Sequence, residues 1–264
     1  MTSPAIKQAP LSGTQPEGVR DEREAAARVR QMFTRITPRY DFLNHLLSFS
    51  LDRVWRRRTA QRFSHILRRP DARVLDLCCG TGDLALTLDR AREQALGGAA
   101  ATRSAIMGAD FVEPMLDHAR RKAQQSERCV VFAAADALCL PYANGAFDLV
   151  TTAFGFRNLA NYEQGLREMA RVLRPGGEAG ILEFSEPERG VMAGLFRFYF
   201  RRVLPRVGGA ISGSSDAYAY LPSSVAGFPS PAALALLMTQ CGFAGVNFIA
   251  WNFGSVVLHT GKRS

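Results

Sequence analysis

The sequence predicts an α/β protein whose mostly parallel sheet is covered by helices on both faces. Short apolar runs such as Val74–Leu77 alternate with stretches in which apolar residues recur at helical spacing. A glycine-containing turn follows the first of these runs, as expected where a strand passes into a helix. Hydrophobic residues make up 47% and charged residues 22% of the 264 residues, which are ordinary values for a globular chain.

The first 70 residues precede the predicted sheet. Residues 1–19 are polar and contain Pro, Gly and Ser, so we expect a disordered tail. A charged helix begins at residue 20, and Pro38 interrupts it. A second helical region covers Leu51–Phe63 and is rich in arginine. We expect residues 20–70 to form a helical N-terminal cap on a single domain that extends over residues 20–264.

Residues 71–185 contain the alternating strands and helices of the predicted core. Strands are expected at Val74–Leu77, Ala105–Asp110, Val130–Ala134, Phe147–Ala153 and Ile181–Phe184. Helices are expected around Leu84–Ala91, Met115–Gln124 and Leu166–Leu173. Strands that alternate with helices in this way are typical of a parallel sheet.

The C-terminal part is predicted to consist of a helical insertion at residues 186–229 and a helix with a hairpin at residues 230–264. In the insertion, Val191–Val207 is a basic amphipathic helix with aromatic residues on its apolar side. Ser230 and Pro231 are typical of a helix start. Two strand-like runs end the chain, Val246–Trp251 and Val256–Thr260, and their short connection predicts a hairpin with an antiparallel last strand.

The charge and the cysteines limit the partners and the compartment. The net charge of +9 favours an anionic partner, either nucleic acid or an anionic membrane surface, although an arginine-rich composition alone gives the same charge. The five cysteines lack the spacing of a disulfide or zinc framework, so no metal site is expected. No apolar run has transmembrane length and no signal-peptide pattern is found. We expect a cytoplasmic protein, with peripheral membrane contact through the basic amphipathic helix as an open alternative.

The turn after the first strand carries the strongest local motif. Gly80 and Gly82 allow the backbone to turn tightly and to approach a ligand, and Thr81 lies between them. By itself this pattern also fits a dinucleotide-binding turn. Asp76, however, places a carboxylate beside the turn, where it would repel a pyrophosphate and attract a cation.

Two further acidic residues follow the next strands. Asp110 ends the second strand, where a carboxylate can accept hydrogen bonds from both ribose hydroxyls. Asp136 and Ala137 follow the third strand, where a side chain and a backbone N–H can bind an adenine edge. A ligand that combines adenosine, an ammonium group and a sulfonium matches this pattern. The sequence therefore predicts S-adenosylmethionine as the cofactor.

Several segments resemble the ubiquinone/menaquinone biosynthesis C-methyltransferases. The similar segments are Tyr40–Asn44 with Ser48 and Trp55, Phe154–Asn158, Arg171–Gly177, Glu183–Ser185 and Ala217–Leu221. The chain departs from the usual pattern at Leu43, Asp52 and Arg174. The resemblance implies a class I, Rossmann-like methyltransferase fold with a seven-stranded sheet, and cofactor contacts at Thr81, Asp110, Asp136 and Ala137. It also implies a polyprenylated demethylquinol substrate, and the N-terminal segment resembles menaquinone-pathway members more closely, which implies methylation of demethylmenaquinol to menaquinol.

Carbon methylation of a quinol is faster from the phenolate, and a fixed cation lowers the pKa of a phenol. Arg157, just after the fourth strand, is the predicted cation, and Asn158 is predicted to orient a water that takes the proton. The predicted substrate and lid contacts are Tyr40, Asp41, Asn44, Tyr218 and Tyr220.

Three alternatives stay open at this point. The first is a ubiquinone-pathway benzoquinol methyltransferase. The second is an RNA-modifying methyltransferase, which the positive charge favours, but no RNA-binding motif is found and no nucleic acid is expected as a partner. The third is a scaffold of a quinone-synthesis complex, which need not bind the cofactor. A homodimer is also an open prediction.

Overall fold

The computed structural model describes residues 13–16, 18–97, 105–187, 194, 198, 199, 202 and 215–264, without the side chains of residues 43, 47 and 215–219. The N-terminal helical elements are α1 (Glu22–Ile36), η1 (Thr37–Arg39), α2 (Tyr40–Leu47), α3 (Leu51–Arg62) and α4 (Ser64–Leu67). The core elements are β1 (Val74–Leu77), α5 (Asp83–Ala95), β2 (Ile106–Asp110), α6 (Glu113–Gln125), β3 (Val130–Ala134), β4 (Phe147–Ala153), η2 (Phe156–Asn158), α7 (Tyr162–Val172) and β5 (Leu173–Phe184). The C-terminal elements are α10 (Ser215–Gly227), α11 (Pro231–Gln240), β6 (Phe243–Trp251), η4 (Asn252–Gly254) and β7 (Val256–Arg263).

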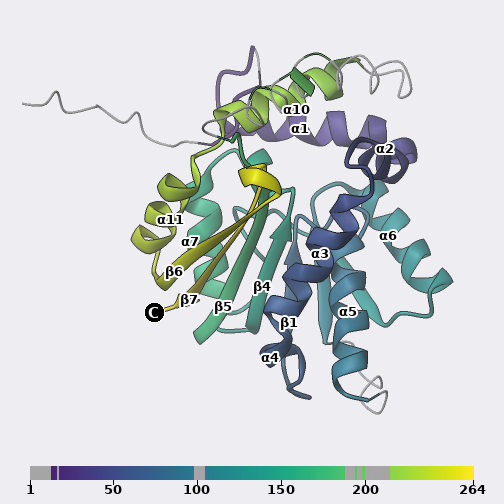
Figure 1. Ribbon diagram of the computed structural model, residues 1–264, viewed down its shortest axis with the longest axis vertical. Helices are drawn as coiled ribbons and strands as arrows, with labels where there is room; N and C mark the ends of the chain where they lie inside the picture. The colour runs from purple at the N-terminus through teal and green to yellow at the C-terminus, as the bar shows by residue number, and fades with distance from the viewer. Residues whose placement is uncertain are drawn as a thin grey trace, which may run out of the picture.

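The seven strands form one sheet in the order β3-β2-β1-β4-β5-β7-β6 (Figure 1). Strands β1 to β5 pair in parallel, whereas β7 is antiparallel to both β5 and β6. The predicted α/β class and the antiparallel last strand are confirmed. The insertion of β7 between β5 and β6 was not predicted, because the sequence of a hairpin does not indicate which of its strands pairs with the rest of the sheet.

Strand β5 is longer than predicted. It begins at Leu173, whereas the sequence predicts a strand only from Ile181. The segment Pro175-Gly176-Gly177 is typical of a loop, and Gly176 has a φ of 74°. In the structure this segment forms an irregularity in the pairing of β4 with β5, where the register shifts between Phe147 and Leu149. Residues 174–177 thus lie opposite the single residue Asp148, so the glycines belong to an irregular excursion that interrupts the pairing of β5 without ending the strand.

Helices cover both faces of the sheet (Figure 1). On one face α3 to α6 pack against the strands, with Phe63, Leu88 and Leu149 fully buried between them. On the other face α7 and α11 bury Leu166 and Leu234 in a second cluster. Burial of this apolar surface is the main source of stability for such a layered fold.

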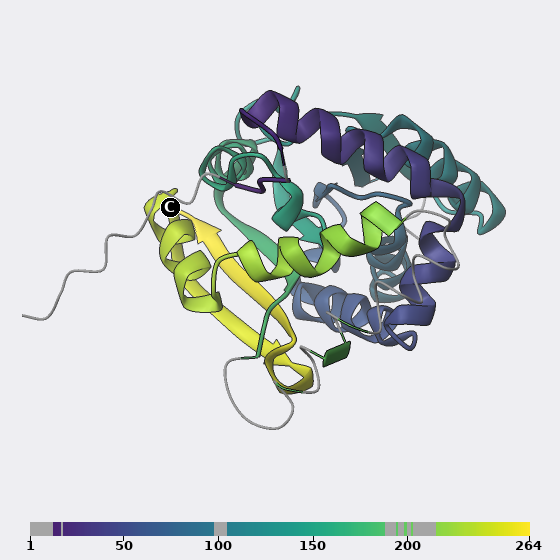
Figure 2. The same ribbon diagram turned by 90° about the horizontal axis from the view of Figure 1, so that it is seen from above.

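A cap of helices lies across the carboxyl ends of the parallel strands. Figure 2 shows α1 and α10 crossing this end of the sheet, and Ile36 on α1 and Val225 on α10 belong to one buried cluster. Thr14 is also buried here, and its N–H donates to the Leu159 carbonyl oxygen at 2.8 Å. Residues 13–16 of the predicted disordered tail therefore have a defined place, because the cap supplies partners that the local sequence does not show.

Among the described residues, no single helix is long and apolar enough to cross a membrane, although the bent pair Tyr220–Gly227 and Pro231–Gln240, at 63°, passes the same test by length and composition. The predicted basic helix at Val191–Val207 lies outside the described residues, apart from single positions within it.

Candidate active site

One pocket lies beneath the cap at the carboxyl ends of β1, β2 and β4. Six of the seven predicted cofactor residues line it: Asp76, Gly80, Thr81, Asp110, Asp136 and Ala137. The predicted residues Tyr40 and Asn158 line the same pocket. The ends of β1, β2 and β3 thus bring together Asp76, Asp110 and Ala137, which are up to 61 positions apart in the chain, as the rule for ligand sites in open α/β sheets requires.

The turn after β1 depends on its glycines. Gly80 and Gly82 have φ values of 54° and 82°, in the left-handed region that favours glycine. A Cβ atom on Gly82 would lie 2.8 Å from the ring of Phe132 on β3, so this position also needs glycine for packing. Gly82 immediately precedes α5 and does not line the pocket. Its role is to shape the turn and to allow the start of α5 to approach the sheet.

Asp76 is the best anchor for a cationic group. The carboxyl group is buried, and its Oδ1 accepts a hydrogen bond from the Thr151 hydroxyl at 3.1 Å. Its Oδ2 is buried and has no hydrogen-bond partner among the described residues. Burial raises the pKa of Asp76 to about 7. A buried oxygen without a partner in the pocket fits the ammonium group of S-adenosylmethionine, which would supply both a proton donor and a positive charge.

Asp110 is held by the backbone at the end of β2. Its Oδ2 accepts the Gly80 N–H at 2.8 Å and its Oδ1 accepts the Val112 N–H at 2.9 Å. Burial nevertheless raises the pKa of this carboxyl group above its ordinary value. Each carboxylate oxygen has a further lone pair, so the fixed group can still accept the two ribose hydroxyls. Asp136 Oδ1 accepts the Leu138 N–H at 2.9 Å, which forms a tight turn around the buried Ala137.

The Thr81 hydroxyl makes a contact that was not predicted. It donates to Asp41 Oδ1 on α2, and Lys122 on α6 lies 2.8 Å from Asp41 Oδ2. Asp41 does not line the cofactor pocket but a neighbouring outer groove. The structure therefore places the predicted substrate contact Asp41 in a link between the cap and the cofactor turn.

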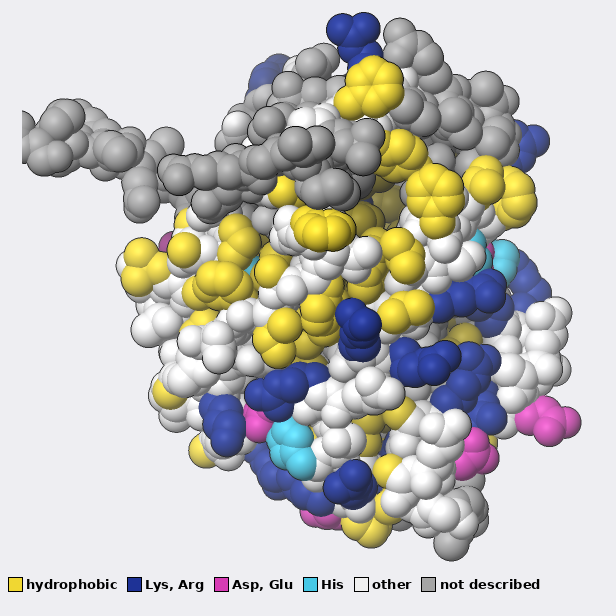
Figure 3. All heavy atoms as spheres, in the orientation of Figure 1, with side chains coloured by type: hydrophobic (Ala, Val, Ile, Leu, Met, Phe, Trp, Pro, Cys, Tyr) yellow, Lys and Arg dark blue, Asp and Glu magenta, His cyan; other side chains and the backbone are white. Residues whose placement is uncertain are grey.

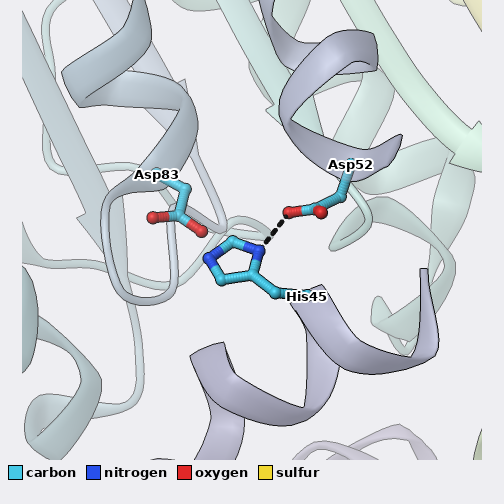
Figure 4. A group of neighbouring side chains, drawn as sticks. All are labelled: His45, Asp52 and Asp83. Atoms are coloured by element: carbon cyan, nitrogen blue, oxygen red, sulfur yellow. Dashed lines mark hydrogen bonds and ion pairs between the residues drawn. The ribbon is translucent and has the colours of Figure 1, made fainter. Parts of the chain in front are cut away.

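Lys122 also pairs with Asp83, which belongs to a neighbouring cluster of charged side chains. Figure 4 shows His45, Asp52 and Asp83 with their side chains directed toward one another, and His45 Nδ1 lies 2.8 Å from Asp52 Oδ2. These groups could hold a metal ion by their spacing alone, within 4.8 Å. Arg56, however, pairs with both carboxylates, and Lys122 pairs with Asp83. Although burial opposes ionisation, Arg56 lowers the pKa of both Asp52 and Asp83. The carboxylates already have cationic partners, so we assign the cluster to cap docking.

Arg157 is buried and paired. Its Nη1 lies 2.7 Å from Glu183 Oε1, and Glu183 Oε2 accepts the Arg157 N–H at 3.2 Å. Although burial opposes the charge, Glu183 raises the pKa of Arg157 above its ordinary value. The Arg157 side chain does not line the pocket, whereas its neighbour Asn158 does. Sequence reasoning did not propose Glu183 as a site residue, although it lies in one of the family-like segments.

The other predicted substrate residues differ in whether they line the pocket. Tyr40 lines the pocket and hydrogen-bonds the Asn44 side chain, and Asn44 itself is outside the lining. The Tyr220 hydroxyl donates to Asn158 Oδ1 at 3.1 Å and lies 2.8 Å from Thr14 Oγ1. The side chain of Tyr218 lies outside the described residues. Tyr220 therefore lies behind Asn158, and of the four predicted substrate residues whose side chains the structure describes, Tyr40 alone lines the pocket.

The pocket also contains aromatic residues that sequence reasoning did not select. Phe33 on α1 and Phe154 after β4 line it, and Phe154 packs on Trp55 with ring centroids 5.9 Å apart. The apolar spacing of Phe33 indicates only a buried helix face, so no local signal distinguishes this pocket residue from an ordinary core residue.

The strand order, the glycine turn and the acidic residues at three strand ends define a class I S-adenosylmethionine-dependent methyltransferase. The chain belongs to the ubiE/COQ5 methyltransferase family, whose pattern it matches over residues 20–263. It is 50% identical to a demethylmenaquinone methyltransferase of Thermus thermophilus, over 88% of this chain and all of that one. It is 44% identical to a protein of the same name from Deinococcus radiodurans, over 93% and 96% of the two chains.

Solved structures agree on the fold. A possible histamine N-methyltransferase of Thermotoga maritima matches with a TM-score of 0.61 at 16% identity, over 89% of this chain and all of that one. An S-adenosylmethionine-dependent methyltransferase of Aquifex aeolicus matches with a TM-score of 0.58 at 15% identity, over 85% and 98% of the two chains. At these identities the likeness concerns the fold alone.

Proposed function

We propose that this enzyme transfers the methyl group of S-adenosylmethionine to a ring carbon of a polyprenylated demethylquinol, and that the reaction is demethylmenaquinol to menaquinol. The relatives with the printed name demethylmenaquinone methyltransferase support this assignment. The observation that carries it is the pocket itself, which is lined both by the buried Asp76 oxygen, unpartnered among the described residues, and by the aromatic residues Phe33, Tyr40 and Phe154. The Asp76 oxygen suits the charged end of the cofactor, and the three aromatic residues suit the flat ring of a quinol.

In the proposed reaction a bond forms between the ring carbon and the methyl carbon while the sulfur–methyl bond breaks. The quinol loses one hydroxyl proton and one ring proton and regains a hydroxyl proton as the aromatic ring is restored, so the net release is one proton. Holding the ring carbon against the methyl group in a pocket that excludes water supplies most of the rate, roughly 7–11 kcal/mol. The cap over the strand ends provides this exclusion.

Asn158 and Arg157 are the proposed catalytic pair. Tyr220 donates to Oδ1 of Asn158, and the amide nitrogen has no hydrogen-bond partner among the described residues, so it can donate to a quinol oxygen and stabilise the phenolate. Arg157 contributes positive charge from behind the pocket wall and fixes η2 through Glu183. Because Glu183 offsets that charge, the effect of Arg157 on the quinol is smaller than that of a free guanidinium.

We place the enzyme in the cytoplasm at the inner face of the membrane, since a polyprenyl tail keeps its substrate in the lipid. The association with the membrane and a homodimer both stay predictions.

The test is an assay of the purified protein with labelled S-adenosylmethionine and two reduced substrates, a demethylnaphthoquinol and a demethylbenzoquinol. The proposal is supported if the naphthoquinol is labelled at least ten times faster than the benzoquinol. Faster labelling of the benzoquinol would assign the ubiquinone pathway, and label in neither would contradict a quinol methyltransferase.

A further inference from the structure

Two phenylalanines occupy backbone positions that disfavour them. Phe49, between α2 and α3, has a φ of 53°, and Phe253, in η4, has a φ of 59°. Bulky residues rarely adopt this left-handed conformation, which glycine and asparagine adopt at lower cost. Each phenylalanine nevertheless leaves 77% of its surface exposed to solvent. The Phe49 ring lies 6.1 Å from the Tyr199 ring, but most of its surface stays in solvent, so burial in the core does not explain a phenylalanine at either tip.

Both tips lie next to α3, at the same end of the molecule (Figure 1). Phe49 precedes α3 by two residues, and the Trp55 side chain on α3 donates to Asn252 Oδ1 beside Phe253 at 2.8 Å. Exposed apolar residues continue this face, at Phe42 and Leu46 on α2 and at Leu51 and Val54 on α3. In Figure 3 hydrophobic side chains gather on the upper part of this view, and lysine and arginine side chains form a band beneath them.

Three exposed arginines on α3 and α5 have no counter-ion among the residues that the structure describes. Arg53 and Arg57 on α3 and Arg90 on α5 are exposed and line one groove with Asp41 and Asp83. The two acids are already paired with Lys122 and Arg56. No ion pair joins Arg53, Arg57 or Arg90 to any residue that the structure describes. Three uncompensated positive charges thus border the apolar face.

This face is also close to the cofactor pocket. Figure 1 shows α2, the start of α3 and η4 at the end of the sheet where the strands finish. Tyr40 on α2 and Arg56 on α3 line the pocket from the inner side of the same two helices. A surface in contact with this face therefore lies one helix thickness from the pocket, about 10 Å.

We propose that this docking face, made of Phe49, Phe253, Leu46, Val54, Arg53 and Arg57, binds the surface of an anionic lipid bilayer. The aromatic tips would enter the interface while the arginines pair with anionic headgroups. This inference rests on the proposed function, since a lipid-tailed quinol then reaches the pocket without leaving the membrane. It assigns the contact to α2, α3 and η4 rather than to the predicted helix at Val191–Val207.

The aromatic tips allow a test that does not depend on destabilisation. Phe49→Asn with Phe253→Asn replaces both residues with one that tolerates the left-handed backbone, so the melting temperature should stay unchanged or rise. Co-sedimentation with vesicles of phosphatidylcholine and phosphatidylglycerol should fall at least tenfold. The matched control is Leu236→Ser, an exposed apolar residue on α11 whose replacement should change binding less than twofold.

The arginines are tested by charge reversal. Arg53→Glu with Arg57→Glu should lower binding to the anionic vesicles at least tenfold, since each arginine contributes roughly fivefold. The control Arg68→Glu with Arg121→Glu makes the same charge change at exposed positions outside the face and should lower binding less than threefold. Wild-type binding should also fall steeply as salt is raised, and it should be weak on vesicles of phosphatidylcholine alone.

Several outcomes would overturn the proposal. The proposal fails if the wild-type protein does not bind the vesicles, or if both face variants bind them fully. It also fails if vesicle binding is lost only when the charges of Arg201, Arg202 and Arg206 are reversed. Tight binding to RNA with none to vesicles would instead identify a nucleic acid as the partner of this face. Methylation of a short-tailed quinol in solution is measured in parallel. Because that assay needs no membrane, failure of the docking proposal is distinguished from failure of the proposed function.

Discussion

The Thr81 hydroxyl, in the turn after β1, donates a hydrogen bond to the Asp41 carboxylate on the cap helix α2. Lys122 joins this contact from α6 by binding Asp41 at 2.8 Å, and it also pairs with Asp83 at the start of α5. Three separate parts of the chain therefore meet at the edge of the cofactor pocket. This arrangement fastens the cap to the turn after β1.

If this contact holds the cap closed, weakening it should speed cofactor release. Asp41→Asn removes the charge that pairs with Lys122 while keeping an acceptor for Thr81. A loss of about 1–2 kcal/mol corresponds to roughly five- to thirtyfold faster dissociation of labelled S-adenosylmethionine in a chase experiment. The control is Asp117→Asn, an exposed acid on α6. An unchanged dissociation rate together with a lower melting temperature would show a purely structural contact.

Asp110 should contribute strongly to cofactor affinity. Because its carboxylate is buried and held by two backbone N–H groups, the Asp110→Ala variant loses a preorganised acceptor for both ribose hydroxyls. We expect S-adenosylmethionine to bind about 2–4 kcal/mol more weakly by calorimetry. Thermal unfolding of the variant without cofactor shows whether the weaker binding comes from the lost ribose contact or from a disordered turn. Wild-type affinity in a folded variant would refute the ribose contact.

The raised pKa of Asp76 predicts that the affinity for S-adenosylmethionine depends on pH. Its pKa of about 7 means that the carboxyl group is neutral below pH 7 and ionised above it in the free protein. A cationic ligand favours the ionised form, so affinity for S-adenosylmethionine should fall about tenfold per pH unit below pH 7, and binding at pH 6 should release a proton. Since the folded protein holds this proton at pH values where the unfolded chain has lost it, the stability of the free protein should fall as pH rises from about 4 to 7.

The matched variant for this prediction is Asp76→Asn, which cannot ionise. Its affinity should be low and nearly constant between pH 5.5 and 7, a range in which an α-amino group keeps its proton. Calorimetry in two buffers of different ionisation enthalpy measures the proton release. A wild-type profile as flat as that of the variant would contradict a contact between Asp76 and the cationic group.

Substitutions of Arg157 and Glu183 should show which part of their effect is on stability and which part is on catalysis. Removing one member leaves the other buried and unpaired, so Arg157→Ala should lower the free energy of unfolding by about 3–5 kcal/mol. Turnover should fall far more than cofactor affinity, and raising the pH should restore part of it, because the quinol then ionises without help. Arg157→Met with Glu183→Leu should recover much of the stability but not the turnover. Full activity in this double variant would end the catalytic role of the pair.

The alternation of apolar runs, helical spacing and glycine turns was sufficient to predict the α/β class, the positions of most elements and the cofactor. This succeeded because strand and helix periodicity are local, and because parallel strands place their carboxyl ends at one edge whatever the details of the packing. Asp76, Asp110 and Ala137 could therefore be predicted as cofactor contacts from their positions near the carboxyl ends of strands, and all three line the pocket. The early start of β5 at Leu173 was missed, because Pro175 and Gly176 look like a loop when the neighbouring strand is unknown.

Only the tertiary structure decided which residues share a contact across long separations in the chain. Asp41 and Tyr220 were predicted as substrate contacts, which stays a prediction, and the structure shows that Asp41 pairs with Thr81 and Lys122 and that Tyr220 donates to Asn158. The ion pair of Arg157 with Glu183 and the joint exposure of Phe49 and Phe253 likewise depend on how β5, α3 and η4 meet. The physical reason is that periodicity tells which face of an element is buried, whereas the partner of a charge or an aromatic ring is set by the packing of separate elements.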